Sequence, residues 1–232
     1  MVIALVLSGG TGSRLGADIP KQYLRVQGRP VLLYCMETLH KSPVIDAVQI
    51  VAAQGWQEEI GSWLEAYGLA EKFRGVSLPG ENRQLSIYNG LTDIRRYAQD
   101  DDLVLIHDAA RPLLSPELIE DCTEAIEGYE GVLPVLPMKD TVYFSEDGRQ
   151  ITSLLDRQAV FAGQAPELFR LGAYYRANER LLPDEILRIN GSTEPAVLAG
   201  MQIAMVPGDE RNFKITTPAD LERFRQIVEN EA

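Results

Sequence analysis

The feature that most constrains the fold stands at the start of the chain, where an apolar run from Val2 to Leu7 leads directly into a glycine-rich loop. The run predicts a buried strand. The loop contains Gly9, Gly10, Gly12 and Gly16, and Pro20-Lys21 follows it. Glycines let backbone N–H groups turn toward a bulky anion at close range, and Arg14 and Lys21 add positive charge beside it. This combination predicts a site for a nucleotide triphosphate at the end of the first strand.

The loop differs from the common phosphate-binding motifs. A P-loop needs Lys followed by Ser or Thr after its glycines, whereas Lys21 follows Pro20 and precedes Gln22. The dinucleotide fingerprint would place Leu15 where its last glycine belongs, and no acidic ribose partner stands about 20 residues further on. The alternative is a plain glycine turn between a strand and a helix. The pairing with Arg14 and Lys21 favours anion binding.

The composition limits the partners of such a site. The 232 residues are 45% hydrophobic and carry a formal net charge of -12, which suits one domain from residue 1 to residue 232. Nucleic acids and anionic membranes need a basic surface, so we expect neither as a partner. No apolar stretch has the length of a membrane span, and the first residues lack the basic start of a signal peptide. Cys35 and Cys122 show no metal-ligand spacing, so we expect buried reduced thiols and a cytoplasmic protein.

Strand and helix patterns alternate along most of the chain. The expected strands are Val2–Leu7, Ala47–Ala52, Val76–Leu78, Leu103–Ile106, Val132–Leu136 and Met201–Pro207. The expected helices are Val31–His40, Trp56–Tyr67, Arg83–Tyr97, Pro116–Glu127, Leu168–Arg180 and Pro218–Glu229, with Ser115 and Thr217 as N-caps of the fourth and the last. This order predicts an α/β protein with a mostly parallel sheet covered by helices on both faces.

Residues 137–165 interrupt the alternation. Asp140–Ser145 and Gln150–Leu155 read as two strands joined by the turn Glu146-Asp147-Gly148, which predicts a β-hairpin. A hairpin inserted in an α/β chain is typical of an arm that projects from the sheet. Such an arm covers a site or pairs with a second subunit.

Three further loops carry polar residues at the predicted strand ends, where ligands bind in open parallel sheets. Gly80, Glu81 and Ser86 suit a base or ribose, with a capped helix start as the equal alternative. Asp108 follows an apolar strand directly and is a natural Mg²⁺ ligand. Arg111 can hold Asp108 or contact phosphate, and a buried ion pair is the alternative for both residues.

His107 and Lys214 complete the candidates. For His107 we expect a hydrogen bond to loop backbone rather than catalysis. Lys214, alone, would read as a solvated side chain ahead of the last helix. Together with Arg14, Lys21 and Asp108 it gives three cations and one metal ligand, a set that suits nucleotidyl transfer because positioning and charge neutralisation do most of the catalysis there.

The order of these motifs resembles one known family. The motifs are Ser8-Gly-Gly-Thr-Gly-Ser-Arg14-Leu-Gly, Pro20-Lys21-Gln22-Tyr23-Leu24, His107-Asp-Ala-Ala-Arg-Pro112, Asp140-Thr141-Val142, Asp156-Arg157 and Lys214-Ile-Thr-Thr-Pro218. They resemble the 2-C-methyl-D-erythritol 4-phosphate cytidylyltransferases and the related ribitol-5-phosphate cytidylyltransferases. The resemblance implies a Rossmann-like nucleotidyltransferase fold with Mg²⁺ as cofactor. It also implies a homodimer whose arms, at about 137–165, embrace.

The resemblance also implies the reaction, in which CTP and 2-C-methyl-D-erythritol 4-phosphate give CDP-methylerythritol and diphosphate for isoprenoid precursors. Catalysis would fall to Arg14, Lys21 and Lys214. CTP would be bound by Gly9, Gly10, Thr11, Gly12, Gly80, Glu81 and Ser86. Asp108 would hold the metal and, with Arg111, contact the substrates. Thr141 and Arg157 would reach the polyol phosphate from the partner subunit's arm.

The chain departs from the family pattern on the acceptor side. It reads Gln164-Ala165-Pro166-Glu167 where the family usually has Gln-Thr-Pro-Gln, and Asn190-Gly191-Ser192-Thr193 replaces a usual Thr-Asp pair. The sequence therefore leaves ribitol 5-phosphate open as the acceptor, for cell-wall or capsule polymer synthesis. A catalytically silent nucleotide-binding regulator is the alternative of another class.

Overall fold

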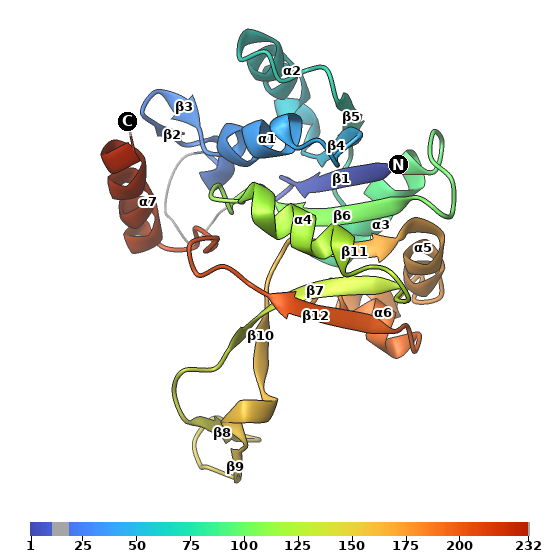
Figure 1. The fold of residues 1–232 in the computed structure, drawn as a ribbon, viewed down its shortest axis with the longest axis vertical. Coiled ribbons are helices and arrows are strands. Elements are labelled where there is room, and N and C mark those ends of the chain that lie inside the picture. Colours follow the sequence, from blue (N-terminus) through green and yellow to red (C-terminus); the bar gives the residue numbers. More distant parts are fainter. Residues whose placement is uncertain (11–18, 232) are drawn as a thin grey trace.

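The computed structural model of the chain describes residues 1–10 and 19–231. Its centre is a twisted sheet in the order β10-β7-β11-β6-β1-β4-β5, with β12 on the outer side of β7 (Figure 1). The strands are β1 (Val2–Leu7), β4 (Ala47–Val51), β5 (Phe73–Ser77), β6 (Leu103–Asp108), β7 (Gly131–Pro137), β10 (Phe161–Gly163), β11 (Glu167–Arg170) and β12 (Ile203–Pro207). Parallel pairs join β1 to β4 and β6, β4 to β5, and β12 to β7. The prediction of a mostly parallel α/β sheet is confirmed.

Helices cover both faces of the sheet, as the alternating side chains of β1 require. Ala4 and Val6 pack in one core with α1 (Leu32–Lys41), α2 (Gln57–Ala66) and α4 (Pro116–Glu124). Ile3 and Leu5 point to the opposite core, with α3 (Arg83–Ile94), α5 (Leu171–Glu179) and α6 (Glu194–Leu198). The last helix, α7 (Pro218–Glu231), packs on the small hairpin of β2 (Arg25–Val26) and β3 (Arg29–Pro30) through a third cluster (Figure 1).

The predicted helix from Leu168 is wrong at its start. Glu167–Arg170 forms β11, antiparallel to both β6 and β7, and the helix begins only at Leu171. Leu168 and Phe169 are fully buried, one in each of the two cores. Pairing with both β6 and β7 therefore decides for a strand, although the local sequence also suits a helix. The small hairpin β2–β3 and strand β10 are likewise absent from the sequence prediction.

The predicted arm is present and projects from one end of the sheet (Figure 1). Its hairpin pairs β8 (Val142–Phe144) with β9 (Ser153–Leu155), and β10 returns the chain to β7. Tyr143, Ile151 and Leu154 on the arm are more than half exposed. Among the described residues, no helix combines the length and the apolarity needed to cross a membrane.

Candidate active site

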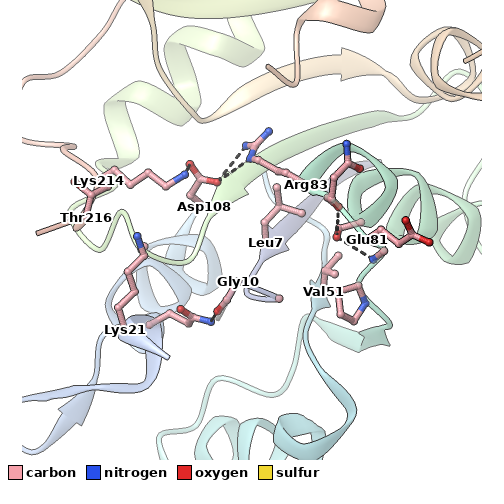
Figure 2. A pocket seen from close by; sticks show the side chains of 16 residues that line it. Leu7, Gly10, Lys21, Val51, Glu81, Arg83, Asp108, Lys214 and Thr216 are labelled. Atoms are coloured by element: carbon pink, nitrogen blue, oxygen red, sulfur yellow. Dashed lines mark hydrogen bonds and ion pairs between the residues drawn. The ribbon is translucent and has the colours of Figure 1, made fainter. Parts of the chain in front are cut away.

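The loops at the carboxyl ends of β1, β5 and β6 surround a cavity of about 470 Å³, which the segment ahead of α7 closes on one side (Figure 2). Such a volume is typical of a small-molecule site, and its place follows the rule for open parallel sheets. The lining residues are Leu7, Gly9, Gly10, Lys21, Gln22, Val51, Pro79, Gly80, Glu81, Asn82, Arg83, Ser86, Asp108, Ala110, Lys214 and Thr216. The structure thus brings together residues from distant parts of the sequence, between Leu7 and Thr216.

Asp108 lies at the centre of the charged wall of this cavity. One carboxylate oxygen, Oδ1, is 3.1 Å from Arg83 Nη2, and the other, Oδ2, is 2.9 Å from Lys214 Nζ and 3.4 Å from Arg111 Nε. Figure 2 shows Asp108 between Lys214 and Arg83. Burial by itself would raise the pKa of Asp108, but the charges of the three cations outweigh it and hold the pKa well below its usual range. Asp108 is therefore ionised near neutral pH and pairs with three cations.

Arg83 is a site residue that the sequence prediction did not single out. It opens α3, and its guanidinium also donates to Ser192 Oγ at 2.6 Å. The sequence signal for this role is that Arg83 stands in the first turn of a helix, where a positive charge does not stabilise the helix. Arg83 connects the loop after β5 to Asp108, at the end of β6.

The loop after β5 is shaped by close contacts at its glycine. A Cβ atom on Gly80 would lie 2.5 Å from Leu85 Cγ and 2.9 Å from the Leu85 backbone, so only glycine fits. The Ser86 hydroxyl accepts from Gly80 N at 3.0 Å and donates to Asn82 O at 2.7 Å. Ser86 thereby holds the loop, and Glu81 remains exposed at the cavity.

The glycine-rich loop is anchored by residues that follow it. Gln22 Nε2 donates to the carbonyl oxygens of Ser8 at 2.7 Å and Gly10 at 2.9 Å, and the buried Tyr23 hydroxyl donates to Ser8 O at 3.0 Å. These buried contacts direct the neighbouring Lys21 to the cavity. Gly9 permits the loop to approach the next one, because a Cβ there would lie 2.8 Å from Pro79 Cβ.

His107 has the supporting role expected for it. Its ring Nε2 lies 3.0 Å from the Arg111 carbonyl oxygen, within hydrogen-bonding distance. Complete burial lowers the pKa of His107 to about 4, so the ring is neutral and Nε2 donates this bond. Arg111 in turn donates from Nη1 to Asn212 O at 2.7 Å, and this contact ties the loop after β6 to the segment that carries Lys214.

A second cavity, of about 380 Å³, adjoins the first at Lys214. Its other lining residues are Arg111, Leu136, Ala162, Gly163, Gln164, Glu210 and Phe213. Two cations, Arg111 and Lys214, therefore face this smaller space. It opens beside the root of the arm, between β7 and the segment ahead of α7.

Most of the predicted site residues that the structure describes meet here. Gly9, Gly10, Lys21, Gly80, Glu81, Ser86, Asp108 and Lys214 line the large cavity, and Arg111 lines the second. Thr11, Gly12 and Arg14 lie outside the described residues. Thr141 and Arg157 are exposed on the arm and line neither cavity of their own subunit, and Arg157 donates from Nη1 to Lys139 O at 2.8 Å.

A mostly parallel α/β sheet whose strand-end loops bring two lysines and a buried aspartate to one cavity suits a nucleotidyltransferase-like enzyme. The model of the 2-C-methyl-D-erythritol 4-phosphate cytidylyltransferase family matches residues 2–230, and the chain belongs to this family. The enzyme of that name from Rubrobacter xylanophilus is 36% identical over 223 residues, which cover 94% of this chain and 91% of its own.

Two other relatives complete the comparison. The ribitol-5-phosphate cytidylyltransferase of Streptococcus agalactiae serotype V is 30% identical over 234 residues, covering 99% of this chain and 95% of its own. The crystal structure of 4-diphosphocytidyl-2C-methyl-D-erythritol synthase from Anaerococcus prevotii superposes with a TM-score of 0.84 at 25% identity, over 99% of this chain and 96% of that one. The predicted family, fold and enzyme class are thus confirmed.

Proposed function

We propose that this enzyme transfers the cytidylyl group of CTP to 2-C-methyl-D-erythritol 4-phosphate and releases diphosphate. The observation that carries this proposal is the large cavity, in which Lys21 and Lys214 face the same space as Asp108 in a chain of the cytidylyltransferase family. The reaction produces CDP-methylerythritol, a precursor for isoprenoid synthesis. A silent regulator would have no need for this set of charged groups.

The reaction exchanges one phosphoanhydride bond of the α-phosphorus for another. A phosphate oxygen of the acceptor attacks the α-phosphorus of CTP, the bond from that phosphorus to the bridging oxygen of the β-phosphate breaks, and diphosphate leaves with the bond's electrons. Negative charge spreads over the phosphoryl oxygens in the transition state. Lys21 and Lys214, together with Arg14, stabilise this charge, and Lys214 exchanges Asp108 for a phosphate oxygen when the nucleotide binds.

Asp108 suits a Mg²⁺ ion that arrives with the nucleotide. Among residues 1–10 and 19–231, no cluster of three or more acidic, histidine or cysteine side chains could hold a metal by itself. Mg²⁺ bound with nucleotides commonly takes one or two carboxylates and completes its shell with phosphate oxygens and water. Asp108 supplies one such carboxylate, ionised and facing the cavity. When bound, Mg²⁺ would neutralise phosphate charge.

The cytidine end of CTP belongs at the loop after β5. Glu81 lies across the cavity from Lys214 (Figure 2), and Gly80 lines the same cavity. Backbone N–H and C=O groups of a tight loop suit the polar edge of a base. Ser86 acts through the loop, because its hydroxyl is already bonded to Gly80 N and Asn82 O. We assign the phosphates of CTP to the glycine-rich loop, of which Gly9 and Gly10 line the cavity.

The acceptor phosphate fits the second cavity. Arg111 and Lys214 face it, and Lys214 is shared with the nucleotide cavity. We assign the polyol contacts of Thr141 and Arg157 to a homodimer, in which the arm of one subunit reaches the site of the other. The exposed apolar side chains of Tyr143, Ile151 and Leu154 support an arm that is covered by a partner.

Ribitol 5-phosphate is the second candidate acceptor, because the ribitol-5-phosphate cytidylyltransferases match this chain over almost its full length. Ala165 also removes a hydroxyl from the acceptor side. With a net charge of -12, the chain is unsuited to nucleic acid or anionic membranes. Its two cysteines are buried free thiols, which supports a cytoplasmic location.

The decisive experiment measures diphosphate release from CTP with each acceptor in turn. We expect the highest kcat/KM with 2-C-methyl-D-erythritol 4-phosphate. A higher kcat/KM with ribitol 5-phosphate would show that the second candidate is the acceptor. Release with neither acceptor, in a sample that binds CTP, would overturn both.

A further inference from the structure

Lys214 occupies a segment that has no secondary structure of its own. Residues 208–217 run from the end of β12 to the start of α7 without a helix or strand, yet Lys214 Nζ lies 2.9 Å from Asp108 Oδ2 between two cavities. A catalytic side chain on irregular backbone needs support from neighbouring elements, because a displacement of about 1 Å can cost about 100-fold in rate. The hydrogen bonds of this segment identify its support.

After Lys214, Ile215 N donates to Ala110 O at 2.8 Å, and before it the support comes from Gln164. Its side chain is 4% exposed and lies where β10 ends, at the root of the arm. The amide oxygen Oε1 accepts from Asp209 N at 3.0 Å, and Nε2 donates to Asp209 O at 2.9 Å and to Asn212 O at 3.3 Å. Gln164 itself is fixed, because its own backbone N donates to Pro134 O at 2.8 Å. Both donors of the amide and its oxygen are thus used on the segment that precedes Lys214.

Asn212, on the segment ahead of α7, also bonds to the residues that follow β10. It is fully buried, and its Nδ2 donates to the Ala165 carbonyl oxygen at 2.7 Å. The backbone of the segment approaches closely as well, since Gly208 N donates to Val135 O at 2.8 Å and a Cβ on Gly208 would lie 3.1 Å from Gln164 Oε1. The segment is therefore bound to the strand pair β7–β10 two residues before the lysine.

We infer that Gln164 is a positioning residue for Lys214: its amide clamps residues 209 and 212 to the return strand of the arm and thereby fixes the lysine ammonium at the phosphate site. Gln164 lines only the second cavity, so its effect on the nucleotide end passes through the lysine. The effect on rate rests on the proposed function. The effect on the position of Lys214 does not.

The test replaces Gln164 by methionine, which keeps the volume and removes the amide. We expect kcat for diphosphate release to fall at least tenfold in the wild-type background and less than twofold when Lys214 is already methionine. Gln49→Met is the matched control, because Gln49 is also 4% exposed and its Nε2 donates to Ser77 Oγ at 3.0 Å. Both residues lie on β4 and β5, at the opposite edge of the sheet from β10. Any effect of Gln49→Met should be the same in both backgrounds.

A crystal structure of the Gln164→Met enzyme provides a readout that does not depend on turnover. We expect residues 209–214 to shift and the 2.9 Å contact between Lys214 Nζ and Asp108 Oδ2 to be lost, while Arg83 keeps its contact with Asp108. An unmoved Lys214 would overturn the inference, as would an equal fall of kcat in both backgrounds. If the wild type releases no diphosphate, the proposed function fails and the crystal structure alone decides the inference. Should Gln164→Met not fold, Gln164→Glu replaces the Nε2 donor by an acceptor and undergoes the same two measurements.

Discussion

Replacing Lys214 by methionine separates catalysis from folding in this enzyme. The lysine side chain is 34% exposed and its ion pair with Asp108 is one of three, since Arg83 and Arg111 also contact that carboxylate. Partly exposed pairs contribute about 0–1 kcal/mol, and methionine retains the apolar stem of the lysine. We therefore expect the free energy of unfolding to fall by no more than about 1 kcal/mol.

The effect on the rate should be much larger. Removing one preorganised group that stabilises transition-state charge commonly costs roughly 2.7–4 kcal/mol, or about 10²- to 10³-fold in kcat. The assay is the initial rate of diphosphate release at saturating CTP and acceptor, with urea unfolding measured on the same preparation. Lys41→Met is the control, because Lys41 is 70% exposed, pairs with Glu37 on α1 and lines neither cavity. It should leave kcat unchanged.

Two results would refute this reasoning. A Lys214→Met enzyme within about threefold of the wild-type kcat would show that the ammonium contributes less than about 0.65 kcal/mol to the transition state. A fall of several kcal/mol in the free energy of unfolding would show that Lys214 is chiefly a structural partner of Asp108. In either case the charged wall of the cavity would serve folding more than catalysis.

Three further results are expected. CTP should be turned over faster than UTP or GTP at matched concentrations, and equal rates would remove the cytidine assignment of the loop at Gly80. Lys21→Met and Arg157→Ala chains, each inactive alone, should regain activity when co-expressed, because one site of the mixed dimer is then wild type; mixed dimers without activity would exclude a cross-subunit role for Arg157. Burial alone would raise the pKa of Asp220, but hydrogen bonds from Thr216 and Thr217 lower it to about 2. The ionised carboxylate therefore stabilises the fold above its ordinary pKa of 3.8. This contribution is lost as the pH falls toward 2. The stability gap between wild type and Asp220→Asn in urea unfolding should therefore shrink by about 1 kcal/mol from pH 6 to pH 3, and a constant gap would contradict the lowered pKa.

The parts of the fold that the sequence predicted are those with a local cause. The run from Val2 to Leu7 is apolar at every position because β1 is buried on both faces between β4 and β6. Ser115 accepts from Leu118 N at 3.2 Å, as an N-cap does. At the start of α7, Asp220 Oδ2 accepts from Thr217 N at 2.8 Å and Thr217 Oγ1 accepts from Asp220 N at 3.3 Å. This reciprocal pair is a helix cap, so the predicted N-cap at Thr217 is present as well.

The parts that the sequence did not predict depend on contacts between distant segments. Strand β11 forms because it pairs with both β6 and β7, and its four residues alone suit a helix as well as a strand. The pair of Arg83 and Asp108 joins residues 25 positions apart. The contacts of Gln164 with Asp209 and Asn212 span 45 and 48 positions. No spacing rule connects such residues before the fold is known.

Asp108 explains how an acidic chain can hold an anionic substrate. The whole chain carries a net charge of -12, which at long range disfavours a triphosphate, so attraction must come from charges gathered at short range. Arg83, Arg111 and Lys214 would repel one another at this distance without an anion between them. The carboxylate of Asp108 contacts all three and reduces this repulsion. Three cations and one anion still leave an excess of positive charge. Because its pKa is held well below the usual range, Asp108 is ionised near neutral pH and pairs with the three cations in this structure. The cations are therefore in place before the nucleotide binds, and little reorganisation remains for the reaction step.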